Sequence, residues 1–559
     1  MSFNLGDRCK YFTLKLMPKY KGCKTLNDIK AIDENYMEND IVDGVWTKDL
    51  EDLKNGNSGY SDEEGMFYAC ENLTSFSSDL SSLNTSRSMF HNCSNLITFT
   101  SDLKSLTSSQ NMFSGCHNLV SFECSDLNNL TNAPSMFQNC SNLTSFKINL
   151  SSLVNGTNMF SQCTNLTTFD GDLSSLEDGW WMFDGCSSLS SFKNDLSSLK
   201  NGLSMFRNCP KLTYFKSNLC SLLSGSNMFY NSDKLETFDC TKMNSLTSGV
   251  YMFYNCKSLK KFECEMDVIS DGRWMFAGCS NLTRFKSDLS SLVEGGAMFS
   301  NCPLTTFIFN NLKSLTNGNS MFVGCNKLTS FEYDLSSLTN GDIMFRDCSN
   351  LTTFKPDLKT LTSGVRMFYN CTNLTTFNSD LSSLTGGTEM FMNCTNLTTF
   401  TSDLSSLTNG HWMFSSNCKL DTPSLKNIAE TINTVSDSNI IHIGIGNTTP
   451  TEEENTYLTQ IHNKGWQVYV NGNNFYNPTD GVALIPIDGE QNIVPIPFWA
   501  KAVPSDEESA NYVDENGNFF NILGGQFIYV NDPESYGMFT SEEDAAAQMR
   551  LTKIEKEEV

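Results

Sequence analysis

Cysteine is the residue type whose number and spacing could most readily support chemistry in this chain. Of the 21 cysteines, fourteen recur at one position of a repeating unit. These are Cys70, Cys93, Cys116, Cys140, Cys163, Cys186, Cys209, Cys256, Cys279, Cys302, Cys325, Cys348, Cys371 and Cys394. Ser232 takes the position once, and Cys418 is shifted by one residue.

Two kinds of chemistry, disulfide formation and zinc binding, are open to such a cysteine column. Neighbouring members are expected within disulfide distance, but equal positions in stacked turns point their side chains the same way. Zinc binding needs Cys and His clustered at short spacing, which the sequence lacks. We therefore predict small, reduced thiols that pack in the core.

Aspartate forms a second column that could bind cations. Its members are Asp79, Asp102, Asp126, Asp172, Asp195, Asp288, Asp334, Asp357, Asp380 and Asp403, and Asn takes the position in other units, as at Asn149 and Asn218. Weak calcium coordination between neighbouring carboxylates is one interpretation. The replacements by Asn favour the other, in which each side chain accepts a hydrogen bond from the backbone of its own turn.

Catalytic residues are not apparent. The five histidines are scattered, and no nucleophile has a base and an orienting group that the sequence identifies. Gly444 and Gly446 lie between a predicted strand and helix, but the third glycine of a dinucleotide loop is missing and no βαβ unit follows. We expect no enzyme, no cofactor and no metal site.

A small set of large side chains interrupts an otherwise Ser- and Asn-rich pattern. Aromatic and Arg residues on a polar background are typical of binding hot spots. The candidate partner-binding residues are Trp180, Trp181, Tyr214, Tyr251, Trp274, Arg284 and Trp412. The alternative is that they fill local gaps in the fold. A row of charged residues, among them Lys216, Asp239 and Glu263, is expected on the same face as the strands.

The element that must position all these residues is an internal repeat. Sixteen Met-Phe pairs start at Met66 and end at Met413, at steps of 23 residues except for two steps of 24. Neither period 2 nor period 3.6 runs through a unit, but each contains a short strand-like Leu-Thr-Thr-Phe piece followed by turn signals. Such units bury their apolar columns by stacking. The pattern predicts a β-rich solenoid of sixteen ~23-residue units.

The repeat resembles that of a known family. Phe-x-x-Cys-x-x-Leu followed by a short strand is similar to the bacterial surface-protein leucine-rich repeats of the BspA type. The Met-Phe start and the Asp-Leu-Ser-Ser-Leu stretch also resemble a repeat of mycoplasma surface proteins. The resemblance implies a binding module, such as an adhesin, a receptor contact, or an appendage of a cell or a gut bacteriophage, without catalytic residues.

The chain divides into four predicted parts. Residues 1–65 are expected to cap the start of the solenoid, which spans 66–419, and residues 420–472 to cap its end. In this second cap we predict helices over Pro423–Thr434, capped by Thr422, and Thr451–Asn463, and strands over Ile440–Ile445 and Trp466–Val470. Residues 473–559 are expected to form a small β-rich attachment module.

Within that module we predict short strands and one helix. The strands are Val482–Ile487, Ile493–Phe498 and Gln526–Val530, with a hairpin turn at Asn516-Gly517 between Tyr512 and Phe519–Ile522. A helix over about Ser541–Thr552 is expected to follow.

Charge and hydropathy exclude several classes of binding partner. The net charge of -25 and the pI near 4.6 argue against nucleic acid and anionic lipid. No apolar run is long enough to span a membrane, and Met1–Lys24 has no signal-peptide pattern. We expect a structural or adhesive protein of a bacteriophage virion, assembled in a host cytoplasm, that contacts other virion proteins or a host-surface receptor or glycan. A bacterial or protist surface adhesin and a cytoplasmic scaffold are the alternatives.

Overall fold

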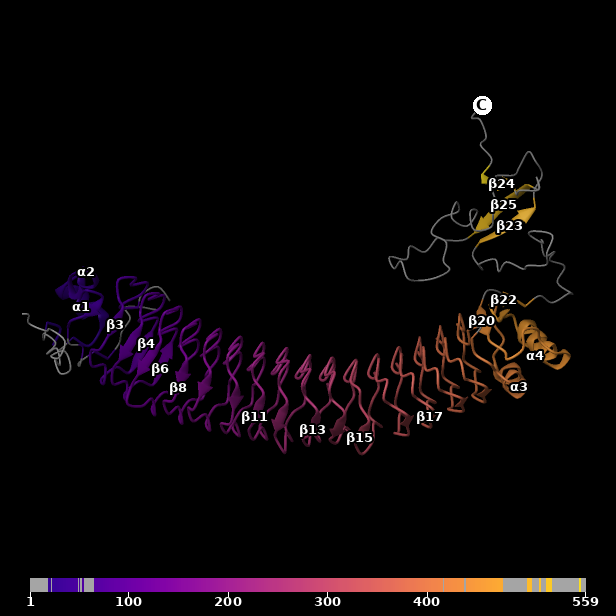
Figure 1. The fold of residues 1–559 in the computed structure, drawn as a ribbon, viewed down its shortest axis with the longest axis horizontal. Coiled ribbons are helices and arrows are strands. Elements are labelled where there is room, and N and C mark those ends of the chain that lie inside the picture. Colours follow the sequence, from indigo (N-terminus) through magenta and orange to yellow (C-terminus); the bar gives the residue numbers. More distant parts are fainter. Residues whose placement is uncertain are drawn as a thin grey trace, which may run out of the picture.

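The repeat folds into a long array of stacked turns. The computed structural model describes residues 19–21, 23–48, 50, 53–54, 65–415, 417–436 and 439–475, and the backbone of 500–504, 512–513, 519–524 and 552–553. About 17 turns of ~23 residues lie side by side along an arc, with α1 and α2 at one end and α3 and α4 at the other (Figure 1). The predicted fold class is confirmed.

Each turn contributes a short strand to a parallel ladder in which equal positions face one another. Phe215 lies opposite Phe238, and Phe262 opposite Phe285. The ladder strands are β2 (Val45–Trp46), β3 (Ser75–Phe76), β5 (Thr98–Thr100), β7 (Ser121–Glu123), β8 (Ser145–Phe146), β9 (Thr168–Phe169), β10 (Ser191–Phe192), β11 (Tyr214–Lys216), β12 (Thr237–Asp239), β13 (Lys261–Glu263), β14 (Arg284–Lys286), β15 (Thr306–Ile308), β16 (Ser330–Phe331), β17 (Thr353–Phe354), β18 (Thr376–Phe377) and β19 (Thr399–Phe400). Because β2 pairs with β3, the ladder begins one turn before the first Met-Phe pair.

A second parallel ladder runs along another side of the turns. It begins with β4 (Thr85–Arg87) and β6 (Ser108–Gln110) and continues as single-residue bridges from Ser108–Asn132 to Gly386–Asn409. In addition, the amide of every Met-Phe phenylalanine except the last donates to the Met carbonyl of the next turn, as Phe90 does to Met112 at 2.8 Å. The turns are therefore bonded to their neighbours on several sides.

The core consists of apolar columns that run the length of the array. Every Met and Phe of the Met-Phe pairs is fully buried. The rings of Phe90 and Phe113 stack with centroids 5.2 Å apart, close to the strand spacing, and Phe99 from the strand column meets both edge-on. The Gly that precedes each Met-Phe pair in many turns lies close to the Met of the next turn. A Cβ on Gly272, for example, would lie 3.0 Å from Met298 Sδ.

The cysteine column lies in this core, as predicted. The thiols are free and buried, and from Cys93 onwards each donates to the carbonyl of the Met-Phe phenylalanine in the preceding turn, as Cys279 does to Phe253 at 3.1 Å. The hydroxyl of Ser232 makes the same bond to Phe206 at 2.9 Å. Cys418, shifted by one residue, still reaches Phe391 at 3.3 Å.

The aspartate column stabilises turns, in agreement with the interpretation that each side chain accepts a hydrogen bond from its own turn. Asp334 Oδ1 accepts from the Ser336 amide at 2.8 Å, and Asn149 makes the equivalent bond to Ser151 at 3.0 Å. Acid and amide accept equally well here, which explains why the two interchange. Over the residues that the structure describes, no group of three or more His, Cys, Asp or Glu could hold a metal ion.

The start of the array packs a helical segment against its first turns. This segment contains α1 (Leu26–Ile32), α2 (Tyr36–Asp40) and β1 (Ile41–Val42), which pairs antiparallel with β2. The fully buried Trp46 stacks on Tyr20 and meets Phe67 of the first Met-Phe turn edge-on. These aromatic contacts cover the end of the apolar columns.

At the other end, helices and strands alternate. The elements are α3 (Thr422–Thr431), β20 (Ile440–Ile443), α4 (Glu452–Asn463), β21 (Gln467–Val470) and β22 (Asn473–Asn474), with β20 and β21 parallel. The second predicted helix is present as α4, and Thr451 caps it in a capping box with Glu454. The predicted cap of α3 is wrong: Asp421 is the cap, because its carboxylate accepts from the Ser424 amide, and the helix ends at Thr431 rather than Thr434.

The last part of the chain is described only at its strands. β23 (Ala500–Pro504), β24 (Tyr512–Val513), β25 (Phe519–Gly524) and β26 (Thr552–Lys553) form a sheet in the order β23-β25-β24-β26. β24 and β25 pair antiparallel, as predicted for these two segments, whereas the predicted turn at Asn516-Gly517 lies outside the described residues. The predicted helix does not include Thr552, which pairs in β26 with Val513. The rest of that helix and the three other predicted strands lie outside the described residues.

Candidate ligand-binding surface

Two variable columns flank the buried Met-Phe pairs. The first holds the residue before each Met and the second the residue after each Phe, and both are at least partly exposed where their side chains are large. Because packing does not dictate these side chains, their chemistry varies from turn to turn. We call them the Met-preceding column and the Phe-following column.

The Met-preceding column has an unusual backbone. Its residues adopt a left-handed conformation, with φ of 55° at Trp181, 56° at Tyr251, 60° at Trp274 and 53° at Trp412. Asn and Ser occupy the position in other turns, such as Asn227 with φ of 56°. Large side chains are strained there, at a cost of order 1 kcal/mol each. Aromatic residues at this position therefore do not serve backbone stability.

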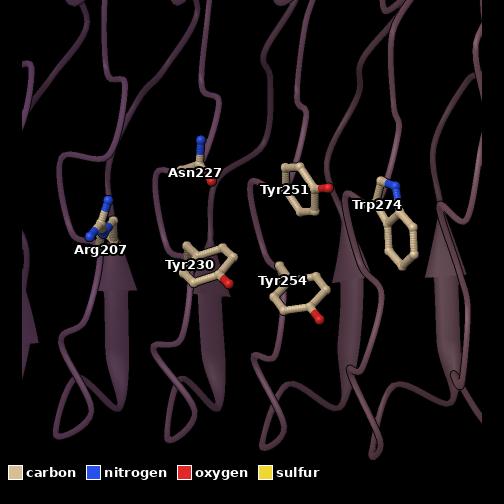
Figure 2. Close-up of a pocket in the computed structure, with 6 residues that line it drawn as sticks. All are labelled: Arg207, Asn227, Tyr230, Tyr251, Tyr254 and Trp274. Atoms are coloured by element: carbon tan, nitrogen blue, oxygen red, sulfur yellow. The ribbon is translucent and has the colours of Figure 1, made fainter.

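Four aromatic residues from these two columns meet in the middle of the array. Tyr251 and Trp274 come from the Met-preceding column, and Tyr230 and Tyr254 from the Phe-following column. With Arg207 and Asn227 they line a surface hollow of about 490 Å³ (Figure 2). We call this site the aromatic hollow.

The rings hold one another in place. Tyr230 and Tyr254 stack with centroids 5.0 Å apart and planes 10° apart, and Tyr251 and Trp274 stack at 5.9 Å and 15°. Tyr251 meets Tyr254 edge-on at 5.5 Å, which joins the two pairs. Stacking along each column follows directly from the spacing of the turns. The result is a platform of four rings that lie side by side (Figure 2).

Charged groups beside the hollow are paired. Arg207 Nε lies 3.4 Å from Asp184 Oδ1, and Arg273 makes two bonds to the Asp271 carboxylate at 2.9 and 2.8 Å. Burial raises the pKa of Asp184, while Arg207 opposes this shift. Neither guanidinium therefore offers an unmatched positive charge to a ligand.

The structure distributes the seven predicted binding residues over several places. Of the seven, Tyr251 and Trp274 lie in the aromatic hollow. Trp180 and Trp181 form a separate tilted pair with centroids 5.1 Å apart, in which Trp180 is 39% exposed. Trp412 stacks on His442 of β20 at 4.1 Å and its amide donates to His442 Nδ1, so it packs against this strand at the end of the array.

Tyr214 and Arg284 lie in the strand ladder, apart from the hollow. The Tyr214 hydroxyl donates to Asp239 at 3.4 Å, and Arg284 Nε donates to Glu263 at 2.6 Å. The predicted charged row is present on this side, and its members pair between turns, as Lys216 does with Asp239. These exposed pairs are worth about 0–1 kcal/mol each.

Sequence reasoning missed Tyr230 and Tyr254. Both occupy the Phe-following column in consecutive turns, where neighbouring turns have Arg207 and Ala277. Alignment of this column beside the Met-preceding column would have shown two adjacent aromatic pairs. The signal was therefore present, but it required the columns to be compared across turns.

Solved structures of bacterial origin are similar to this chain. A leucine rich cell surface protein from Faecalibacterium prausnitzii is 17% identical over 64% of this chain and 89% of its own, with a TM-score of 0.30. A leucine-rich repeat protein from Bacteroides ovatus is 19% identical over 68% of this chain and 94% of its own, with a TM-score of 0.36. No curated protein matches the chain.

A family model agrees with the repeat that the structure shows. The model described as BspA type leucine rich repeat region matches residues 61–190, 131–248, 202–329 and 316–441. Together these matches span the described turns from the first Met-Phe pair to β20. The chain therefore belongs to the BspA type leucine rich repeat family.

Proposed function

We propose that this chain is a non-catalytic binding protein that makes adhesive or protein–protein contacts through the exposed columns of its solenoid. The family itself points to a non-catalytic adhesive or protein–protein role. The observation that carries the proposal is the aromatic hollow, where Tyr251 and Trp274 accept a strained backbone to present their rings at the surface.

We further propose that the chain is a structural or adhesive component of a bacteriophage virion. The buried thiols support assembly in a reducing cytoplasm, because each serves the core as a free, hydrogen-bonded group. The net charge of -25 favours a soluble assembly that does not bind nucleic acid. Other virion proteins or a host-surface receptor or glycan are the partners. Of the helices that the structure describes, none is long and apolar enough to cross a membrane.

Fractionation of the source tests whether the chain belongs to a virion, the cell envelope or the cytosol. Phage particles, cell envelope and cytosol are separated, and the chain is quantified in each by mass spectrometry. Recovery at fixed stoichiometry in purified particles is expected. Recovery only in the envelope contradicts the virion and favours a surface adhesin, whereas recovery only in the cytosol favours a scaffold.

Cell binding tests the adhesive role independently of the setting. The labelled full chain is added to intact host cells, and retention is compared with that of a Tyr251→Ser/Trp274→Ser variant and of a Trp180→Ser control. We expect the first variant to be retained less and the control to be retained normally. Equal retention of all three chains contradicts a role for the hollow in adhesion.

A further inference from the structure

We propose that the aromatic hollow binds a neutral, hydroxyl-rich saccharide. The hollow is lined by Arg207, Asn227, Tyr230, Tyr251, Tyr254 and Trp274. This proposal rests on the proposed binding function and names the ligand of that site. It follows from the shape of the ring platform, the unpaired polar groups on it, its charge and its rigidity.

The ring platform offers apolar surface in a form that fits sugar rings. A pyranose presents C–H groups on its faces and hydroxyls around its rim, so it stacks on aromatic rings while it makes hydrogen bonds at its edge. Trp274 is 40% exposed although it is packed against Tyr251. Tyr and Trp supply rigid contact area with a polar tip, which suits a ligand that is partly apolar and partly polar.

Polar groups without a protein partner surround these rings. Among the residues that the structure describes, the hydroxyls of Tyr230, Tyr251 and Tyr254 and the side-chain amide of Asn227 make no hydrogen bond. Each phenol can donate and accept one bond, and the amide can do both. Figure 2 shows all four groups on the same side of the turns. This mixture of donors and acceptors matches the hydroxyl rim of a saccharide.

The charge balance selects a neutral ligand. The two guanidinium groups beside the hollow, those of Arg207 and Arg273, already face Asp184 and Asp271. A sulfated or sialylated glycan would have to compete with these carboxylates in a chain of net charge -25. A neutral sugar meets neither obstacle.

Rigidity lowers the entropic cost of binding. The amide of Asn227 donates to Val250, that of Tyr251 to Arg273 and that of Trp274 to Gly296, at 2.8 to 3.1 Å. The backbone of each contributing turn is thus fixed to the next turn, and the rings are fixed by stacking. A preformed platform loses little freedom when it binds. The same bonds occupy backbone donors that a peptide would need to add a strand, which disfavours an extended peptide as ligand.

Variants that follow the repeat itself test the proposal. Trp274→Ser and Tyr254→Ser introduce the residue that the chain has at equivalent positions, Ser320 and Ser300, so the fold is expected to persist. Trp180→Ser is the matched control, because Trp180 is an exposed Trp outside the hollow and Ser226 occupies its position in another turn. Circular dichroism of each full-length variant verifies the fold.

The full chain is screened on a printed array of neutral hexose and N-acetylhexosamine oligosaccharides, sialylated and sulfated glycans, and proline-rich peptides. The affinity for the best neutral oligosaccharide is then measured by calorimetry. We expect each hollow variant to bind about tenfold or more weakly, since a buried aromatic contact commonly contributes that much. The control is expected to bind within about twofold of the wild type.

Four other outcomes overturn the saccharide proposal. They are binding to none of the neutral oligosaccharides, preference for charged glycans, binding to the peptides alone, and neutral binding that the hollow variants leave unchanged. Loss of cell retention in the Tyr251→Ser/Trp274→Ser variant would still support adhesion in these cases. A failure of the saccharide proposal is therefore distinguishable from a failure of the proposed function.

Discussion

The hydroxyl of Ser232 donates to the carbonyl of Phe206 at 2.9 Å, at the position where the other described turns place a thiol. The thiols on either side, those of Cys209 and Cys256, make the same bond at 3.3 Å. The column therefore requires a small side chain that donates a hydrogen bond to a buried carbonyl. Cysteine meets this need while adding apolar volume, and serine meets it with a shorter bond.

Substitution at Ser232 tests this requirement. Ser232→Val removes the donor and leaves the Phe206 carbonyl buried without a partner, so we expect a loss of about 1–3 kcal/mol in unfolding free energy. Ser232→Cys keeps a donor, and its effect is expected to stay below about 1 kcal/mol. Urea unfolding followed by circular dichroism measures both. Equal losses in the two variants would show that packing, rather than the hydrogen bond, defines the column.

Alkaline pH is expected to destabilise the array. Burial raises the pKa of the Cys325 and Cys418 thiols to about 12, from an ordinary value of 9.0. The folded chain therefore keeps protons that the unfolded chain releases, so stability is retained below pH 9 and falls as pH rises from 9 towards 12. Urea midpoints measured from pH 7.5 to 10.5 should be level at first and then decline. A level profile throughout would contradict burial of the thiols.

Backbone strain at Ile343 offers a stabilising substitution. This β-branched residue of the Met-preceding column has φ of 60°, where Asn158 of an equivalent turn has 55°. Ile343→Asn is expected to raise the unfolding free energy by about 1 kcal/mol, because Asn tolerates the left-handed conformation. The reverse change, Asn158→Ile, serves as the control and is expected to lower it by a similar amount. A loss of stability in Ile343→Asn would sink the strain argument.

The end of the solenoid is expected to loosen in acid. Burial, and to a lesser degree the neighbouring His411, lower the pKa of His442 to about 3 from 6.5. The unfolded chain then binds a proton that the folded chain excludes, so the contribution to stability is complete above pH 6.5 and is lost as pH falls towards 3. Hydrogen exchange of residues 410–470 at pH 7 and pH 5 measures it. In His442→Gln the difference between the two pH values should shrink.

The regular part of the fold could be predicted because its residues repeat. The spacing of the Met-Phe pairs defines the turns, the exchange of Cys for Ser at Ser232 indicates a buried thiol column, and the exchange of Asp for Asn at Asn149 indicates a turn bond. Each of these conclusions uses many copies of one position. The repeated units of one chain can therefore be compared with one another much as homologous sequences are compared in an alignment.

The irregular parts could not be predicted as well, because their contacts join segments that the repeat does not relate. Trp412 has the same position as Trp274, but its partner His442 comes from β20, after the repeat has ended. The prediction placed the cap of α3 at Thr422, whereas the structure has it at Asp421. The difference arises because the first turn of a helix accepts Pro423 one residue further in than the prediction assumed. The ring platform depends on the side-by-side placement of two columns, and it becomes visible in the sequence only when both columns are compared across turns.

The two 24-residue steps point to how such a chain can change over generations. Phe122 to Leu127 holds one residue more than Phe99 to Leu103, yet Cys140 still reaches Phe113, at 3.2 Å. Since each turn bonds only to its neighbours, recombination between near-identical stretches of the gene can add or delete whole turns and leave the remaining columns intact. The distance from the aromatic hollow to either end of the array can therefore change by one turn at a time, and selection can act on that distance.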